Sequence, residues 1–364
     1  MTHDRLLNEL WEASLARLGG EAAITASART TRAFIKPRGV KSAPDLLRLV
    51  LAYCLGGLGL RSTAAWAASI ELADLSNVAL LRRLHNASDW LLHLVGQSLG
   101  AGARLPVGGR MIHILDATSV PKAGSDARAG NGIWRLHCAF DLTEERFSFF
   151  ELTDEKGSEQ FDRVPVVAGE IRIADRGYMH PDRLAAVHAA GGDLIVRAGW
   201  KSVRWLATDG QPFDLIAALE SAKTTGILDT PVAIARKKAP ALNVRLIALR
   251  KPQAAAQTSK LKARRAAQRE GSAISGKTLA AAEWVILVTT LDADTYTAEA
   301  IGDLYRLRWR IELAFKRLKS VIGLAGPPGK DPRTARAWIL AHLLMILLLE
   351  PHVSAPEVSP RLAA

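Results

Sequence analysis

The feature that most constrains the fold is a pair of short apolar runs that each end in an aspartate. Met111–Leu115 leads into Asp116, and Glu170–Ala174 leads into Asp175. Each run has the length of one strand, and helical and strand-like patterns alternate after the second. This order predicts a mixed α/β sheet with chemistry at the carboxyl ends of its strands. A single aspartate at such a place is more often a turn residue or helix cap.

The remaining patterns divide the chain into five segments. They are an all-helical N-terminal region (1–107), a first part of the sheet domain (108–199), a strand-rich basic insertion (200–292), C-terminal helices that complete the sheet domain (293–350) and a tail (351–364). Further strands are predicted at Ile133–Leu142, Arg146–Leu152, Asp193–Arg197, Val203–Ala207, Pro231–Ala235, Val244–Leu249 and Trp284–Thr289. Helices are predicted at Leu6–Trp11, Leu46–Tyr53, Ser62–Ala68, Asn77–His93, Glu159–Val167, Pro181–Ala190, Thr297–Ser320 and Pro332–Leu349.

Positive charge is concentrated in two places. The net charge is +12, yet Arg236–Glu270 alone has eleven basic residues and one acid, and Tyr305–Lys319 has six basic residues and one acid. These two segments carry +10 and +5, so the rest of the chain is weakly acidic. Clustering of this kind attracts a polyanion such as DNA. A solvated basic face explains a single such cluster equally well.

Composition excludes several other classes of protein. The two cysteines, Cys54 and Cys138, cannot make a disulfide framework and lack the spacing of a zinc site, which favours a reducing cytosol. The N-terminus lacks the pattern of a signal peptide. The longest apolar run, Trp338–Leu349, is too short to cross a bilayer. A soluble cytosolic protein is expected.

The most specific pattern is the helical segment Tyr305–Lys319. At 100° per residue, Tyr305, Arg308, Glu312 and Lys319 fall within one arc of about 60°, with Lys316 beside them. The apolar residues of the segment form a separate stripe. One carboxylate among six cations suits a metal ligand beside a surface that grips phosphates. Taken alone, the segment is explained as well by an amphipathic helix with an Arg308–Glu312 ion pair.

Together these motifs resemble the DDE transposases of the insertion-sequence-4 group. Asp116 precedes Ala-Thr, Asp175 precedes Arg-Gly-Tyr, and the helix has Tyr, Arg, Glu and Lys at Y-(2)-R-(3)-E-(6)-K spacing. The resemblance implies a ribonuclease-H-like α/β fold with a strand-rich insertion before the glutamate helix. It also implies Mg²⁺-dependent cleavage at transposon ends and joining to target DNA, with Mn²⁺ as a substitute metal. Water and then a DNA 3′-hydroxyl are the expected nucleophiles.

The resemblance also assigns roles to residues. Asp116, Asp175 and Glu312 are the expected catalytic metal ligands, since Mg²⁺ takes carboxylate oxygens together with water and substrate phosphate. The expected DNA-binding residues are Tyr305, Arg308, Lys316, Lys319, Arg176, Arg236, Lys237 and Lys238. The N-terminal helices are expected to bind transposon ends. The expected partner is double-stranded DNA, on which two copies of the chain form a homodimer. The expected location is the bacterial cytoplasm, at the nucleoid, with no membrane.

Several alternatives remain open. Gly271–Thr278 matches the phosphate-loop pattern G-x-x-x-x-G-K-[ST], but no strand leads into it, and a flexible loop is favoured. Some family members stack an aromatic on a flipped base, and Trp200, Trp205 or Trp284 could do so here, although a core position is favoured for each. Only 45 residues follow Lys319, fewer than in many relatives. A decayed copy that binds DNA without catalysis, or a plain nuclease of the same fold, is the alternative function.

Overall fold

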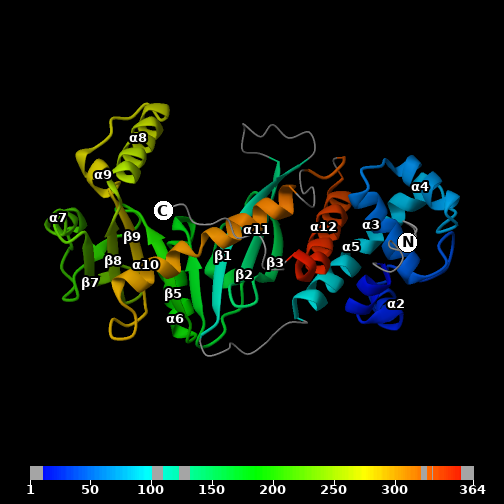
Figure 1. Ribbon diagram of the computed structural model, residues 1–364, viewed down its shortest axis with the longest axis horizontal. Coiled ribbons are helices and arrows are strands. Elements are labelled where there is room, and N and C mark those ends of the chain that lie inside the picture. The colour runs from blue at the N-terminus through cyan, green and yellow to red at the C-terminus, as the bar shows by residue number, and fades with distance from the viewer. Residues whose placement is uncertain (1–10, 101–109, 123–131, 321–325, 330, 354–364) are drawn as a thin grey trace.

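The fold is built on one nine-stranded mixed sheet. A computed structural model describes residues 11–100, 110–122, 132–320, 326–329 and 331–353, and its strands follow the order β3-β2-β1-β4-β5-β9-β8-β7-β6 (Figure 1). The strands are β1 (Ile112–Pro121), β2 (Ile133–Asp141), β3 (Arg146–Asp154), β4 (Ile171–Ala174), β5 (Asp193–Ala198), β6 (Trp205–Leu206), β7 (Ile227–Ile234), β8 (Leu242–Arg250) and β9 (Trp284–Thr289). The α/β class and the ribonuclease-H-like fold predicted from the sequence are confirmed.

The centre of the sheet is parallel and buried on both faces. β1, β4 and β5 pair in parallel, whereas every other pairing in the sheet is antiparallel. All four residues of β4 are buried, as expected for a short strand covered on both sides. The two faces form separate apolar cores. One core joins the N-terminal and C-terminal helices to the sheet, and the other lies under α6 (Pro181–Ala189) and the insertion.

The insertion extends the same sheet instead of forming a separate one. β9 pairs with β5, and β8, β7 and β6 follow outward. The insertion also contains three helices that were not predicted: α7 (Leu215–Ser221), α8 (Gln253–Arg269) and α9 (Gly276–Ala281). α8 buries none of its residues, so no apolar periodicity shows it. Its many Ala, Gln, Lys and Arg residues are good helix formers, and they account for the helix.

At the other end of the molecule, helices from both ends of the chain pack together. They are α2 (Gly20–Thr30), α3 (Ala43–Leu55), α4 (Leu60–Ser69), α5 (Asn77–Gly100) and α12 (Pro332–Val353) (Figure 1). α12 packs chiefly on α5 and α3 and also touches β3. The window Pro332–Leu349 is long and apolar enough to cross a membrane, but 72% of it is buried within the protein. A core helix explains this apolar composition. Residues 1–10 and 101–109, which include the start of the first predicted helix and the predicted boundary between segments 1–107 and 108–199, lie outside the described residues.

The predicted helix Glu159–Val167 is wrong. Only Phe161–Arg163 forms a single 3-10 turn. The reason lies on β4, where the fully buried Arg172 donates to the carbonyl oxygens of Phe161 (2.7 Å), Val164 (2.9 Å) and Pro165. Those carbonyls are therefore unavailable to a helix, and the segment is held as an extended loop against the sheet.

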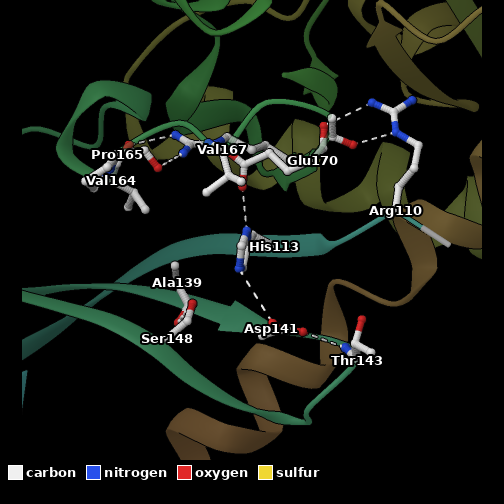
Figure 2. Close-up of polar contacts among 12 residues, drawn as sticks. Arg110, His113, Ala139, Asp141, Thr143, Ser148, Val164, Pro165, Val167 and Glu170 are labelled. Atoms are coloured by element: carbon white, nitrogen blue, oxygen red, sulfur yellow. Dashed lines mark hydrogen bonds and ion pairs between the residues drawn. The ribbon is translucent and has the colours of Figure 1, made fainter. Parts of the chain in front are cut away.

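The charge of Arg172 is balanced by a buried network. Its Nε donates to Glu170 at 2.7 Å, and the second oxygen of Glu170 lies 2.5 Å from Nδ1 of His113. Figure 2 shows His113 of β1 between Glu170, which directly precedes β4, and Asp141, the last residue of β2. Burial opposes ionisation of Glu170, but the bond from His113 and the charge of Arg172 outweigh it and lower its pKa. The network anchors the start of the parallel strands, away from the two aspartates at their far end.

Candidate active site

Asp116 and Asp175 lie at the point where the β1–β4 pairing ends. The parallel register runs from Ile112↔Ile171 to Leu115↔Ala174, so the two aspartates are the next residues on neighbouring strands. The prediction that Asp116 ends its strand is wrong, because β1 continues to Pro121 against β2. Asp175 does end its strand, and its carboxylate accepts from the backbone N–H of Gly177 at 2.7 Å. The aspartates are nonetheless side by side.

Glu312 reaches this point from a helix pair that crosses the sheet. The predicted single helix Thr297–Ser320 is broken into α10 (Ala298–Arg306) and α11 (Trp309–Ser320). Between them the bonds tighten to i→i+3, including Arg308 N–H to the carbonyl of Tyr305 at 3.1 Å. α10 packs on β5 and β8, whereas α11 packs on β1. The break therefore separates a helix over β5 and β8 from a helix over β1.

The break places Arg308 between two of the predicted carboxylates. Its guanidinium donates to Asp116 Oδ2 at 3.4 Å and to Glu312 Oε1 (Figure 1 shows α11 crossing β1). One side chain therefore links Asp116 on the sheet to Glu312 on α11, across 192 residues of sequence for the longer contact. Ile311, Ala314 and Phe315 hold α11 in the apolar core, but Leu307, at the break, is exposed.

Like charges crowd the aspartates. Burial raises the pKa of Asp116 to about 6, and the carboxylates of Asp175 and Glu159 add to the rise; the N–H of Ala117 and the charge of Arg308 oppose it. Burial and Asp175 likewise raise the pKa of Glu159. The site thus favours an added cation.

Glu159 was missed by sequence reasoning. A Cβ built on Gly177 would lie 2.0 Å from its Oε2 and 3.1 Å from Asp175 Oδ1, so these two oxygens are at most about 5 Å apart. Glu159 lies in the loop held by Arg172, and no periodic pattern or motif in the sequence distinguishes it.

Asp116, Asp175, Glu159 and Glu312 carry the oxygen ligands that a divalent cation needs, but their side chains do not converge on one point. Carboxylate oxygens are the ligands that Mg²⁺ and Mn²⁺ prefer. Within the described part of the chain, no three acidic, histidine or cysteine side chains converge as a ready metal site. Arg308 instead lies between Asp116 and Glu312, and its guanidinium contacts both carboxylates.

Beside the aspartates, a cation-lined cavity opens between β5, β9 and α8. It has a volume of about 360 Å³ and is lined by Arg176, Arg197, Lys251 and Lys262, with no acidic residue in its wall. Arg176 directly follows Asp175 in the sequence and borders both sites. Burial, together with the charges of Arg197, Arg176 and Lys262, lowers the pKa of Lys251 to about 8.

Two of the three tryptophans that were considered for stacking on a flipped base line this cavity. Trp200 and Trp284 both line it, whereas Trp205 does not. Trp284 and Trp205 are 3% and 6% exposed and belong to the core, as favoured from the sequence; Trp200 is half-buried at the cavity. A base bound in this cavity would contact Trp200 and Trp284 and not Trp205.

The other predicted DNA-binding residues fall in two places. Tyr305 is half-buried beside Arg308, and burial raises its pKa. Lys316 and Lys319 are exposed on α11. Arg236, Lys237 and Lys238 lie in the turn between β7 and β8, at the opposite end of β8 from α8. Arg236 is paired there with Asp182 at 2.7 Å.

The phosphate-loop pattern at Gly271–Thr278 does not form a phosphate loop. A helix, α8, precedes it where such a loop needs a strand. Its second half is the start of α9, with Ser275 as the N-cap accepting from Thr278 N–H at 3.2 Å, so the predicted flexible loop is only partly present.

Comparison with known proteins agrees with this geometry. The family model described as "Transposase DDE domain" matches residues 108–348. The chain is 40% identical over 347 residues to a putative transposase InsL for insertion sequence element IS186A, from Escherichia coli strain K12, covering 93% of each chain. It is also 40% identical over 348 residues, with the same coverage, to the transposase for insertion sequence element IS421 from Escherichia coli. The chain therefore belongs to the DDE transposases of insertion-sequence elements, enzymes of the insertion-sequence-4 group that act on DNA with a divalent metal.

Proposed function

We propose that this transposase moves its element by a cut-and-paste route, with Asp116, Asp175 and Glu312 holding Mg²⁺. One observation carries the proposal: a single guanidinium links the carboxylates of Asp116 and Glu312 beside Asp175. The proposal is supported by this link between Asp116 and Glu312, which are 196 residues apart, and by the position of Asp175 on the strand next to β1. Mn²⁺ would serve as a substitute, since the ligands are all oxygens.

The roles of the chain's own residues follow from their positions. A divalent cation bound there would supply positive charge to the attacking and leaving oxygens of a phosphoryl transfer. Arg308, once it leaves the two carboxylates, would hold a DNA phosphate through paired N–H donors. Arg176 and the exposed Lys316 and Lys319 would orient the strand on either side. Water would attack first, and the freed DNA 3′-hydroxyl would attack the target.

A strand-transfer assay tests the proposal. Purified protein, Mg²⁺, a plasmid with the element's own terminal inverted repeats and a target plasmid should give cleavage at the ends and joined products. Asp175→Asn should give neither, because the amide removes one negative charge at nearly the same size. Cleavage without joining would identify a plain nuclease. DNA binding without any cleavage would identify a decayed copy.

We also propose that the N-terminal helices bind the element's ends and that two copies pair on that DNA in the bacterial cytoplasm. Support comes from exposed cations at the end of α2 (Arg29) and in the link between α2 and α3 (Lys36, Arg38 and Lys41). Arg83 of α5 holds this link by donating to the carbonyls of Lys36 (3.1 Å) and Arg38 (2.9 Å). Footprinting of end DNA and the mass of the complex by light scattering check the two parts; protection absent from the ends, or one copy per end pair, would overturn them.

A further inference from the structure

The basic stretch Arg236–Arg269 is not one surface, because the fold pairs many of its cations. Arg245 is 9% exposed and bound to Asp229, and its Nη1 donates to backbone carbonyls near α10. Arg250 and Lys260 both pair with Glu283. These cations support the fold, as does the Arg236–Asp182 pair already described. The cations whose charge is still available must be sought elsewhere in the stretch.

They lie on α8. Lys262, Arg265 and Arg269 are exposed, and no acidic partner is found for them in the described ranges. At 100° per residue they fall at 0°, 300° and 340°, which is one stripe about 60° wide. In an amphipathic helix, cations gather on one face because the opposite face packs inward. α8 contributes no residue to a core, so packing does not explain this stripe.

Side-chain contacts near the middle of α8 nevertheless hold it to the neighbouring segments. Lys251 Nζ donates to Ser259 Oγ of α8 at 2.9 Å and to the carbonyl of Ala282 at 2.8 Å. Lys260 of α8 forms an ion pair with Glu283 at 2.5 Å. These contacts join α8 to the segment that enters β9. Figure 1 shows α8 and α9 projecting from the end of the sheet remote from the helical bundle.

The stripe leads toward the catalytic aspartates. Lys262 lies both on the stripe and in the wall of the cavity, together with Ser259 and Ala263 of α8. The opposite wall contains Arg197 and Arg176, the neighbour of Asp175. Positive charge therefore continues from the exposed face of α8, through the cavity, to the edge of the candidate active site.

We propose that α8 is a DNA-gripping arm, whose Lys262, Arg265 and Arg269 bind the phosphate backbone of the duplex next to the bond that is cut. This rests on the proposed function, since the duplex must lie across Asp116 and Asp175. Duplex DNA is the occupant because its backbone carries dense negative charge, about one per 1.7 Å of axis. A stripe of three cations with no acidic partner suits a phosphate backbone better than a folded protein partner.

The test is a set of matched triple variants. In the arm variant, Lys262→Gln, Arg265→Gln and Arg269→Gln remove three positive charges, and Gln keeps a similar helix propensity. In the control variant, Lys223→Gln, Arg333→Gln and Arg336→Gln remove the same charge from exposed cations already paired with Glu220, Asp331 and Asp89. Circular dichroism and thermal melting verify that both are folded. The affinity for a duplex of the element's end is measured by fluorescence anisotropy from low to high salt.

The arm variant should lose about two to three units from the slope of log affinity against log salt, since each phosphate contact contributes about 0.9. The control variant should keep the wild-type slope. Equal losses in both variants, or no loss in the arm variant, would overturn the proposal. The wild-type protein separates the two hypotheses: if it binds and joins DNA while the arm variant keeps the full slope, the arm is wrong and the transposition mechanism stands. If the wild type binds DNA with a slope that depends on α8 but never cleaves, the arm stands and the mechanism falls.

Discussion

The acidic centre (Asp116, Asp175 and Glu159) and the cation-lined cavity lie next to each other at the carboxyl ends of the parallel strands. They carry opposite charge, and in each of them groups of the same charge lie close together. At the acidic centre, burial and the carboxylates of Asp175 and Glu159 raise the pKa of Asp116 to about 6. In the cavity, burial and three cations lower the pKa of Lys251 to about 8. In both places the fold crowds like charges, which disfavours the charged form.

The two regions have opposite charge, so each should bind a different component of the reaction. Crowded carboxylates are relieved by a metal cation, and crowded cations are relieved by phosphate. Arg176 lies between the two groups, directly after Asp175 and in the cavity wall. The two regions together match the two components that phosphoryl transfer on DNA requires, and each can be changed separately.

The largest effect should come from the acidic centre. We expect Asp116→Asn to lower end cleavage by at least about 10³-fold, because a metal ligand and its charge are lost. DNA binding in the absence of metal should stay within a few-fold of wild type. Gel-based cleavage and anisotropy measure the two. A variant that cleaves normally would remove Asp116 from the site.

Arg308→Gln should separate the two charges at the centre. Without the guanidinium between Asp116 and Glu312, the metal-free protein should bind Mn²⁺ more tightly, as seen by calorimetry. Cleavage should nevertheless fall by about 10- to 100-fold, because the phosphate loses a charge-assisted contact. Arg308→Lys should restore part of the cleavage. Weaker Mn²⁺ binding in Arg308→Gln would show that Arg308 does not compete with the metal.

The raised pKa of Asp116 has a consequence for stability without metal. The folded protein holds this proton more tightly than the unfolded chain, so the contribution of Asp116 to the free energy of unfolding falls as the pH rises from about 4 to about 6. Asp116→Asn lacks this fall. In chelator, the variant should therefore gain about 2 kcal/mol on wild type between pH 4 and pH 7. Urea unfolding at several pH values measures the free energy of unfolding of both proteins. If the difference between them is the same at every pH, the pKa of Asp116 is not raised in the folded protein.

The smallest effect concerns Lys251 in the cavity. Its pKa of about 8 means that it loses its proton between pH 7 and pH 9, whereas an ordinary lysine stays charged there. DNA affinity of the wild type should drop about 3- to 10-fold over that interval, more than in Lys251→Met. Anisotropy at fixed salt gives both curves. Identical pH dependence in the two proteins would place the DNA elsewhere.

Much of the sheet could be predicted because its strands are short apolar runs bounded by polar residues. Ile133–Asp141, Asp193–Ala198 and Trp284–Thr289 agree with their predictions to within a residue. The helix predicted at Glu159–Val167 failed because Arg172, a residue of another element, takes its carbonyl groups. α8 was missed because a helix that buries none of its residues shows no apolar period.

The family and the α/β class could be read from the sequence alone, because motif spacing and apolar runs are local properties; the three expected carboxylates stay a prediction from the same motifs. Only the tertiary structure decided the bend that puts Arg308 between Asp116 and Glu312, and the approach of Glu159 to Asp175. It also decided which cations of the basic stretch are paired and which remain free on α8. These contacts join residues far apart in the chain, and their electrostatic energy depends on distance and burial, which sequence spacing does not specify.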